Sequence, residues 1–180
     1  KGEHKTPEHL NRHPLGKVPA IEINGEHFFE SNAICRLLAE LNDNRMYGVT
    51  AVERAKVNQW IDFMGYHVGR WLSVFFFEEI IKPAISEDPK DDNAIGEAQG
   101  FLDEQLPALE QAIANTGYIG GGGLSIADTI AFAYFQTTDF TSVSLEKYPA
   151  IARWYTTIKA RPAYTKAMQK LPKQSINPFA

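Results

Sequence analysis

The sequence predicts two unlike parts, an α/β unit followed by an all-helical unit. An apolar run of strand length precedes Asn24-Gly25, a strong signal for a type I′ hairpin turn, and a second short strand leads into a helix. The stretch that follows, NDNRMYGVT, is rich in Asn, Asp and Gly and indicates a linker. Beyond it, apolar residues recur only at helical spacing. We therefore expect an α/β unit at 1–43, a linker at 44–50 and a helical unit at 51–180.

The end of the hairpin nearest the first long helix carries groups that suit a peptide ligand. Pro19 cannot donate a ladder hydrogen bond, so it is expected at a strand start, and the Val18-Pro19 bond can be cis. A cis bond would turn the backbone N–H and C=O of Val18 outward, where an extended peptide could pair with them. The helix is expected to start at Ser31, whose hydroxyl could cap it, and a helix N-terminus favours a carboxylate. Glu30 beside it would attract an ammonium group, so one amino-acid zwitterion fits this corner.

Residues 1–15 are polar and predict a short helix that Pro7 starts and Pro14 ends. His9 and His13 lie four residues apart on this helix and could share a metal ion. No carboxylate or cysteine at ligand spacing completes a site, and closed zinc sites need about four ligands. We therefore predict no metal.

Capping signals and glycines divide the helical unit. Thr50 and Glu53 have the spacing of a capping box, and the helix that follows is expected to continue to Lys82-Pro83. Within it, Gly65 and Gly69 predict a bend or a close backbone approach. A long amphipathic helix is expected next, ending before Gly117, which suits its C-terminal cap.

A second capping box is expected at Ser125 and Asp128. Capping explains a carboxylate at a helix start fully, so Asp128 is expected to be structural rather than catalytic. The preceding glycine run, 120–123, is not a phosphate-binding P-loop, because no Gly-Lys-Ser/Thr follows it. Two more helices are expected at 148–161 and around 164–171.

Several motifs together resemble one family. V-P-A at 18–20 followed by E-S at 30–31 resembles the glutathione-binding half of the glutathione S-transferases. G-E-H-K-T-P at 2–7 is similar to a loop of plant phi-class and related bacterial enzymes, and L-S-I-A-D at 124–128 is similar to the capping box of a buried helix in the family. The resemblance extends over essentially the whole chain and is phi/theta-like. It implies an incomplete thioredoxin-like N-terminal domain, lacking its first β-α-β elements, followed by an all-helical C-terminal domain.

The resemblance also implies which residues bind ligands. The glutathione-binding residues would be His4, Lys5, Lys17, Val18, Pro19, Glu30 and Ser31. The first three would face the glycine carboxylate, Val18 the cysteinyl backbone, and Glu30 with Ser31 the γ-glutamyl end. Candidates for the electrophile pocket are Tyr66, His67, Arg70 and Trp71. Ordinary packing is the alternative for these four residues, because aromatic side chains at helical spacing are mostly core.

The function implied is that of a glutathione transferase, which conjugates the thiolate of glutathione, its co-substrate, to apolar electrophiles in detoxification. Its catalytic Ser, Tyr or Cys would lie on a first strand upstream of Lys1, so we expect the sequence to begin inside a longer protein and leave the catalytic residue unknown. Cys35 is no substitute, because a thiol in mid-helix is normally packed. Two alternatives stay open. One is a non-catalytic module, because E-S-N-A-I at 30–34 also resembles the gamma subunit of translation elongation factor one. The other is a glutathione-dependent thiol reductase or dehalogenase.

Composition narrows the partners. The formal net charge is −4 with dispersed basic residues, which gives no electrostatic footprint for nucleic acid. The single cysteine excludes an internal disulfide and suits a reducing, cytoplasmic location. No apolar run reaches membrane-spanning length. A homodimer is expected from the resemblance alone.

Overall fold

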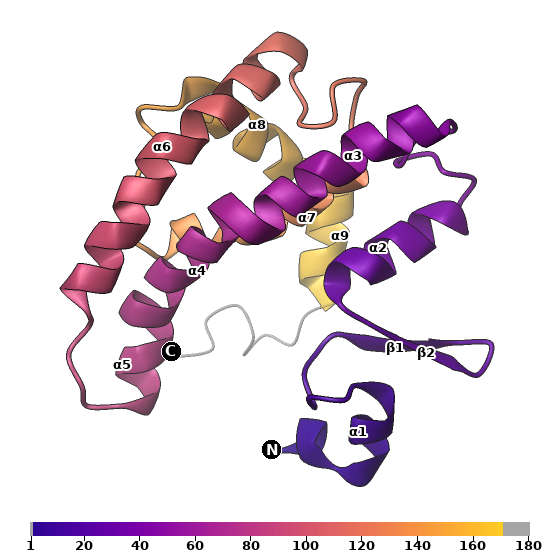
Figure 1. Cartoon of the computed structure of the whole chain (residues 1–180), viewed down its shortest axis with the longest axis horizontal. Helices are drawn as coiled ribbons and strands as arrows, with labels where there is room; N and C mark the ends of the chain where they lie inside the picture. Colours follow the sequence, from indigo (N-terminus) through magenta and orange to yellow (C-terminus); the bar gives the residue numbers. More distant parts are fainter. Residues whose placement is uncertain (1, 171–180) are drawn as a thin grey trace.

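The computed structural model describes residues 2–170, so the last ten residues of the expected helical unit lie outside the described range. The chain opens with a 3₁₀ turn, η1 (Glu3–Lys5), and the short helix α1 (Pro7–Arg12). The described residues contain one sheet, an antiparallel pair of strands β1 (Ala20–Ile23) and β2 (Glu26–Phe29). The helix α2 (Ser31–Glu40) follows directly. Figure 1 shows α1 and the hairpin beside one end of a larger helical body.

The hairpin turn has the backbone that the sequence predicts. Asn24 has φ 55° and Gly25 has φ 84°, so both central residues lie in the left-handed region that a type I′ turn requires. The resulting register pairs Ala20 with Phe29 and Ile23 with Glu26. The predicted turn is therefore confirmed.

The start of α2 differs from the prediction in one respect. The helix begins at Ser31 as expected, but Glu30 is its N-cap residue, and no side chain caps it within the described residues. The expectation that the Ser31 hydroxyl caps this helix was wrong. Ser31 already has the helical position N1, whereas a capping side chain reaches the helix from the residue before it.

A single long helical run crosses the middle of the molecule. It comprises α3 (Ala51–Phe63), a π-helical turn η2 (Met64–Val68), α4 (Gly69–Phe76), a second π-helical turn η3 (Phe77–Ile81) and α5 (Lys82–Ile85). The predicted capping box of Thr50 and Glu53 starts it. Gly69 marks the predicted close approach, because a Cβ built there would lie 2.6 Å from Cδ1 of Tyr134.

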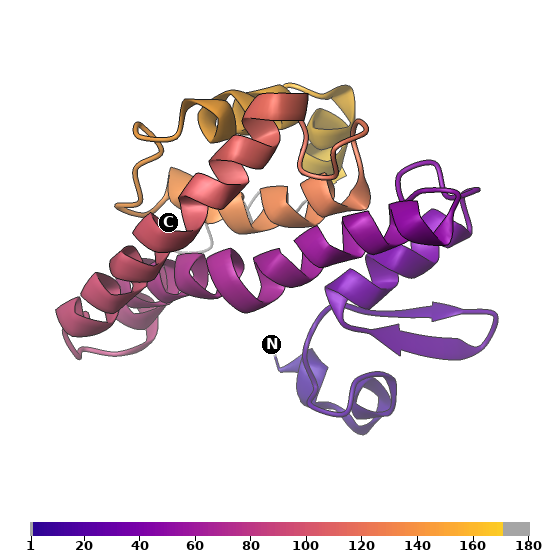
Figure 2. The same ribbon diagram turned by 45° about the horizontal axis from the view of Figure 1, so that its top comes forward.

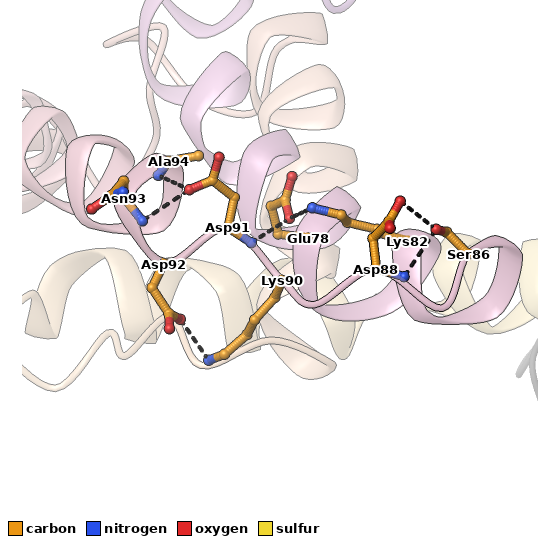
Figure 3. Close-up of polar contacts among 9 residues, drawn as sticks. All are labelled: Glu78, Lys82, Ser86, Asp88, Lys90, Asp91, Asp92, Asn93 and Ala94. Atoms are coloured by element: carbon orange, nitrogen blue, oxygen red, sulfur yellow. Dashed lines mark hydrogen bonds and ion pairs between the residues drawn. The ribbon is translucent and has the colours of Figure 1, made fainter.

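The helix α6 (Asp92–Thr116) packs along α4 and α8. Asp91 caps its start, and Gly117 ends it with φ 79°. Glu78, only 7% exposed, joins α6 to the preceding run: its carboxylate accepts a hydrogen bond from Nζ of Lys82 (2.8 Å) and one from the backbone N–H of Asp91 (2.8 Å). Figure 3 shows this carboxylate between the two donors. One buried acid therefore connects the start of α5 to the residue that caps α6.

The remaining helices close the core. They are α7 (Ile126–Phe135), the 3₁₀ turn η4 (Gln136–Asp139), α8 (Pro149–Lys159) and α9 (Pro162–Lys170). In Figure 2, α7 lies between the α3–α4 run and α8, and it contacts α2, α3, α4 and α8. None of the described helices has both the length and the apolar character needed to cross a membrane.

The start of α7 holds the most buried acid of the described chain. The expected capping box of Ser125 and Asp128 is present, and Asp128 is fully buried. Its carboxylate accepts hydrogen bonds from the Ser125 N–H and hydroxyl (2.8 and 2.9 Å), the Ile119 N–H (2.8 Å) and Nε1 of Trp154 (2.9 Å). These contacts join α7, the loop before it and α8.

Candidate functional site

The hairpin register brings the predicted ligand-binding residues to one end of the sheet. Because Ala20 pairs with Phe29, the next residues outward, Pro19 and Glu30, continue from the same end of the two strands. Neighbouring strands lie about 4.8 Å apart, so a peptide of a few residues could span the two segments. The Val18-Pro19 bond, which the sequence allows to be either cis or trans, is cis.

Val18 presents an unpaired backbone at this end. Its side chain is 75% exposed, and it lies outside the ladder, which starts at Ala20. Within residues 2–170, neither its N–H nor its C=O forms a hydrogen bond. Both groups are therefore available to a strand-like ligand, which is the means by which extended peptides add to a sheet edge.

Glu30 and Ser31 are both exposed at the N-terminus of α2. Glu30 has φ 66° and ψ 112°, a backbone conformation that a non-glycine residue rarely adopts. Its negative charge also reaches α7. The pKa of Tyr134 is raised, chiefly by burial and secondly by the charge of Glu30. The helix N-terminus and this carboxylate together offer partners for the two charges of an amino-acid zwitterion.

The segment before Val18 is held by side chains of η1 and α1. Nζ of Lys5 donates to the carbonyl of Leu15 (3.1 Å), and Nε2 of His9 donates to the carbonyl of Lys17 (2.8 Å). The Leu15 N–H donates to Nδ1 of the buried His13 (3.1 Å). Lys5 is thus engaged with this loop, while the Lys17 side chain is exposed.

A cavity of about 730 Å³ opens beside this loop. Its lining brings together Val18 and His4, two of the predicted glutathione-binding residues, with His9 and Arg12. His4, His9 and Arg12 supply nitrogen donors on this wall, while Glu3 and Glu8 supply carboxylates, and Glu8 pairs with Arg12 at 2.7 Å. The full lining is Gly2, Glu3, His4, Thr6, Glu8, His9, Arg12 and Val18.

The four candidates for the electrophile pocket lie on η2 and α4 in different surroundings. Tyr66 is 76% exposed, and His67 is exposed beside Phe63. Trp71 stacks on Phe101 of α6 with ring centroids 4.2 Å apart, and the Arg70 guanidinium lies 4.7 Å from the Trp71 ring centroid. Trp71 therefore packs between helices, and the assignment of these four residues to a pocket stays a prediction.

Cys35 does not have the environment of a reactive thiol. Burial raises its pKa above the usual value, and the nearby charge of Arg36 opposes this only in part. A thiolate is the reactive form, so a raised pKa disfavours reaction. Within residues 2–170, no group of three or more His, Cys, Asp or Glu side chains could hold a metal ion.

The sequence did not predict that His9 and His13 contact the loop beside the candidate site. Their spacing of four residues could suit a shared metal ion, although the sequence predicts no metal. The structure turns both rings onto the loop that precedes Val18. The one signal for this arrangement is their position on a short helix directly before that loop.

Comparison with known proteins assigns the family. Residues 1–40 match the glutathione S-transferase N-terminal domain, and residues 72–162 match the glutathione S-transferase C-terminal domain. The chain is 31% identical to the probable glutathione S-transferase GSTF2 of Oryza sativa subsp. japonica, over 92% of this chain and 79% of that protein. The chain belongs to the glutathione S-transferase family.

Solved glutathione S-transferase structures share the fold. The structure of glutathione S-transferase-I bound with lactoylglutathione superposes with a TM-score of 0.84 at 29% identity, over 92% of this chain and 80% of that one. A theta-class glutathione S-transferase from Xanthomonas axonopodis pv. citri with glutathione bound gives 0.81 at 25% identity, over 91% and 78% of the two chains. The expected fold class, a thioredoxin-like unit followed by a helical domain, is confirmed.

A second kind of relative also matches this chain. Elongation factor 1-gamma 1 of Oryza sativa subsp. japonica is 33% identical over 91% of this chain. The chain spans only 39% of the length of that relative. The relatives of this chain therefore include proteins named glutathione S-transferase and proteins named elongation factor 1-gamma.

Proposed function

We propose that the protein conjugates the thiolate of reduced glutathione to apolar electrophiles. The observation that carries the proposal is the hairpin register, which sets the free backbone of Val18 and the α2 N-terminus at one end of the sheet. Val18 binds the cysteinyl backbone in this proposal, and Ser31 with the α2 N–H groups binds the γ-glutamyl carboxylate. Glu30 binds the ammonium group.

The opposite end of glutathione carries a second carboxylate. His4, Lys5 and Lys17 precede Val18 in the chain, and His4 lines the cavity that Val18 also lines. The two lysines would hold the glycine carboxylate by charge-assisted hydrogen bonds, and a ring N–H of His4 could donate to it as well. The chain thereby binds and orients the tripeptide, while the group that stabilises the thiolate is not among the residues assigned. Burial raises the pKa of Cys35, which disfavours its reactive thiolate form, so we do not assign the role to this residue.

The test is binding and conjugation by the intact protein. We expect retention on immobilised glutathione and conjugation of an aromatic electrophile with a halide leaving group. Glu30→Gln keeps the size of the side chain but removes its charge, and should weaken glutathione binding about tenfold or more. Glu26→Gln, at the turn end of the same hairpin, is the matched control and should bind normally.

The elongation factor relatives favour a second candidate, a non-catalytic interaction module. Absence of retention on glutathione would support this candidate and overturn the first. Retention without conjugation would instead support a glutathione-dependent thiol reductase or dehalogenase.

We also propose the organisation that the family resemblance implies: domains at 1–43 and 51–180 joined by 44–50, a homodimer and a cytoplasmic location. Sedimentation velocity at micromolar concentration tests the dimer, and a monomer would contradict it. Fluorescence microscopy of the tagged intact protein tests the location.

A further inference from the structure

Two histidines of the α1 region contact the loop that leads into Val18. His9 lies in the last turn of α1, and His13 is the C-cap residue of that helix. Nε2 of His9 lies 2.8 Å from the Lys17 carbonyl, which can only accept, so this nitrogen carries a proton. Nδ1 of His13 accepts from the Leu15 N–H at 3.1 Å, so this nitrogen is unprotonated.

The two rings hold the loop at both of its ends. The backbone carbonyl of His13 accepts a hydrogen bond from the Gly16 N–H (2.8 Å). The His13 ring packs on Phe29 of β2, with ring centroids 4.9 Å apart. Gly16 is buried with φ 56°, and a Cβ at this position would lie 2.5 Å from the His4 carbonyl oxygen. The loop therefore lies against η1 and α1 with no room for adjustment at Gly16.

This arrangement matters because Val18 itself has no backbone hydrogen bond within the described residues. The last bonded group before it is the Lys17 carbonyl, which belongs to the peptide unit that contains the Val18 N–H. His9 therefore fixes the orientation of the plane that carries the Val18 donor. His9 also lines the cavity beside Val18.

We propose that His9 and His13 are positioning residues for glutathione. They hold the Lys17–Val18 peptide in the orientation that the cysteinyl backbone binds, and thereby lower the ordering cost of binding. The choice of glutathione as the ligand rests on the proposed function, whereas the contacts of the two rings with the loop are observed directly. Neither ring takes part in the reaction, so the effect should fall on glutathione affinity alone.

The first arm of the test uses the ligand-free intact protein. Backbone amide hydrogen exchange at Leu15 and Gly16 should be about fivefold faster in His9→Ala than in wild type, because loss of one hydrogen bond loosens the loop. His9→Gln offers an N–H at a similar reach and should restore slow exchange. His27→Ala, whose ring pairs with Glu22 on the hairpin, is the control and should leave both amides unchanged.

The second arm measures kinetics. His9→Ala should raise the KM for glutathione about fivefold, with kcat and the KM for the electrophile unchanged, and His9→Gln should recover the wild-type value. His13→Asn keeps an oxygen that can accept from the N–H two residues on, so it should bind glutathione more tightly than His13→Ala.

The outcomes separate the two proposals. Unchanged exchange in His9→Ala overturns the positioning role whether or not glutathione binds. Faster exchange with normal glutathione KM also overturns it. If the wild-type protein binds no glutathione, the proposed function is wrong. Glutathione is then also wrong as the ligand of the positioned loop, whatever the exchange experiment shows.

Discussion

The N-terminal unit and the helical unit are held together by different forces. Among residues 2–40, the buried side chains are those of His13, Ile34 and Ala39, while Leu10, Leu15, Phe29 and Leu38 are 41–63% exposed. In contrast, the helical unit has a continuous core in which Ile61, Leu72, Leu102 and Ile151 are fully buried. The glutathione-binding residues proposed here all lie on the unit with the smaller core. Its geometry therefore depends on a few polar contacts to loop backbone, whereas the helical unit depends on close packing.

The largest expected effect is on the packed unit. Asp128→Ala leaves the Ile119 N–H and Trp154 Nε1 without their buried acceptor, and each such loss costs about 1–3 kcal/mol. We expect the free energy of unfolding to fall by about 3 kcal/mol or more, measured by chemical denaturation. Trp154→Phe removes one donor and should cost less. An unchanged denaturation midpoint for Asp128→Ala would contradict the role of this carboxylate.

The next effect tests close packing directly. Gly69→Ala places a Cβ 2.6 Å from both the Met64 carbonyl oxygen and Cδ1 of Tyr134. Overpacking of this kind destabilises by about 1–3 kcal/mol. The better helix propensity of Ala offsets about 1 kcal/mol of this cost, so at the low end of the range the two effects cancel. Since the carbonyl is backbone and cannot turn away, we expect net destabilisation and a lower melting temperature. Gly65→Ala, with its nearest atom at 3.7 Å, is the matched control and should be neutral or stabilising.

A smaller effect is expected at the junction of the two units. Arg36 of α2 donates to Oδ1 of Asn58 (2.8 Å) and to Oδ1 of Asp62 (3.0 Å) on α3. Because Asp62 is 57% exposed, its share is small, and Arg36→Ala should cost about 1 kcal/mol. Hydrogen exchange should increase in α2 and stay constant in α6. Equal increases in both helices would show that the two units do not differ as described.

The smallest expected effect is the pH dependence of the stability that Glu78 contributes. The hydrogen bonds from Lys82 and from the Asp91 N–H hold the pKa of Glu78 below its usual range, against the opposing effect of burial. A carboxyl group whose pKa is depressed on folding stabilises the protein above its unfolded pKa of about 4.3, and this stabilisation is lost as the pH falls through the folded pKa. The stability difference between wild type and Glu78→Gln should therefore be larger near about pH 7 than near about pH 3. Glu104→Gln, at an exposed position of α6, is the control for the loss of one surface acid.

Local chemistry made much of the fold predictable. Asn24-Gly25, Thr50 with Glu53, and Gly117 each act within a few residues of chain, so their types and spacing define a turn, a helix start and a helix end. The cap of α2 was not predictable in this way. Glu30 adopts a left-handed φ that its residue type does not favour, and it does so where the hairpin passes directly into the helix.

The ligand-binding residues proposed here come from sequence motifs and stay a prediction, whereas the contacts that support them could not be predicted from the sequence. The motif around Val18 and Glu30 indicated a ligand, and the register shows how the two segments meet. The contact of His9 with the Lys17 carbonyl depends on the path of a loop in three dimensions, which spacing along the chain does not encode. The burial of Glu78 is likewise tertiary, because it needs the α6 N-terminus to return beside η3.

The turn at Asn24-Gly25 has a consequence at a distance. The turn lies at the opposite end of the hairpin from Val18 and Glu30. It nevertheless sets the strand register, and a shift of one residue would move Val18 relative to Glu30 and turn the side chains of one strand to the other face. An insertion of one residue at the tip would leave every proposed contact residue in the sequence and still separate their positions. The Asn24-Gly25 turn thus sets the distance between Val18 and Glu30 that bound glutathione would have to span, although the turn lies outside the proposed site.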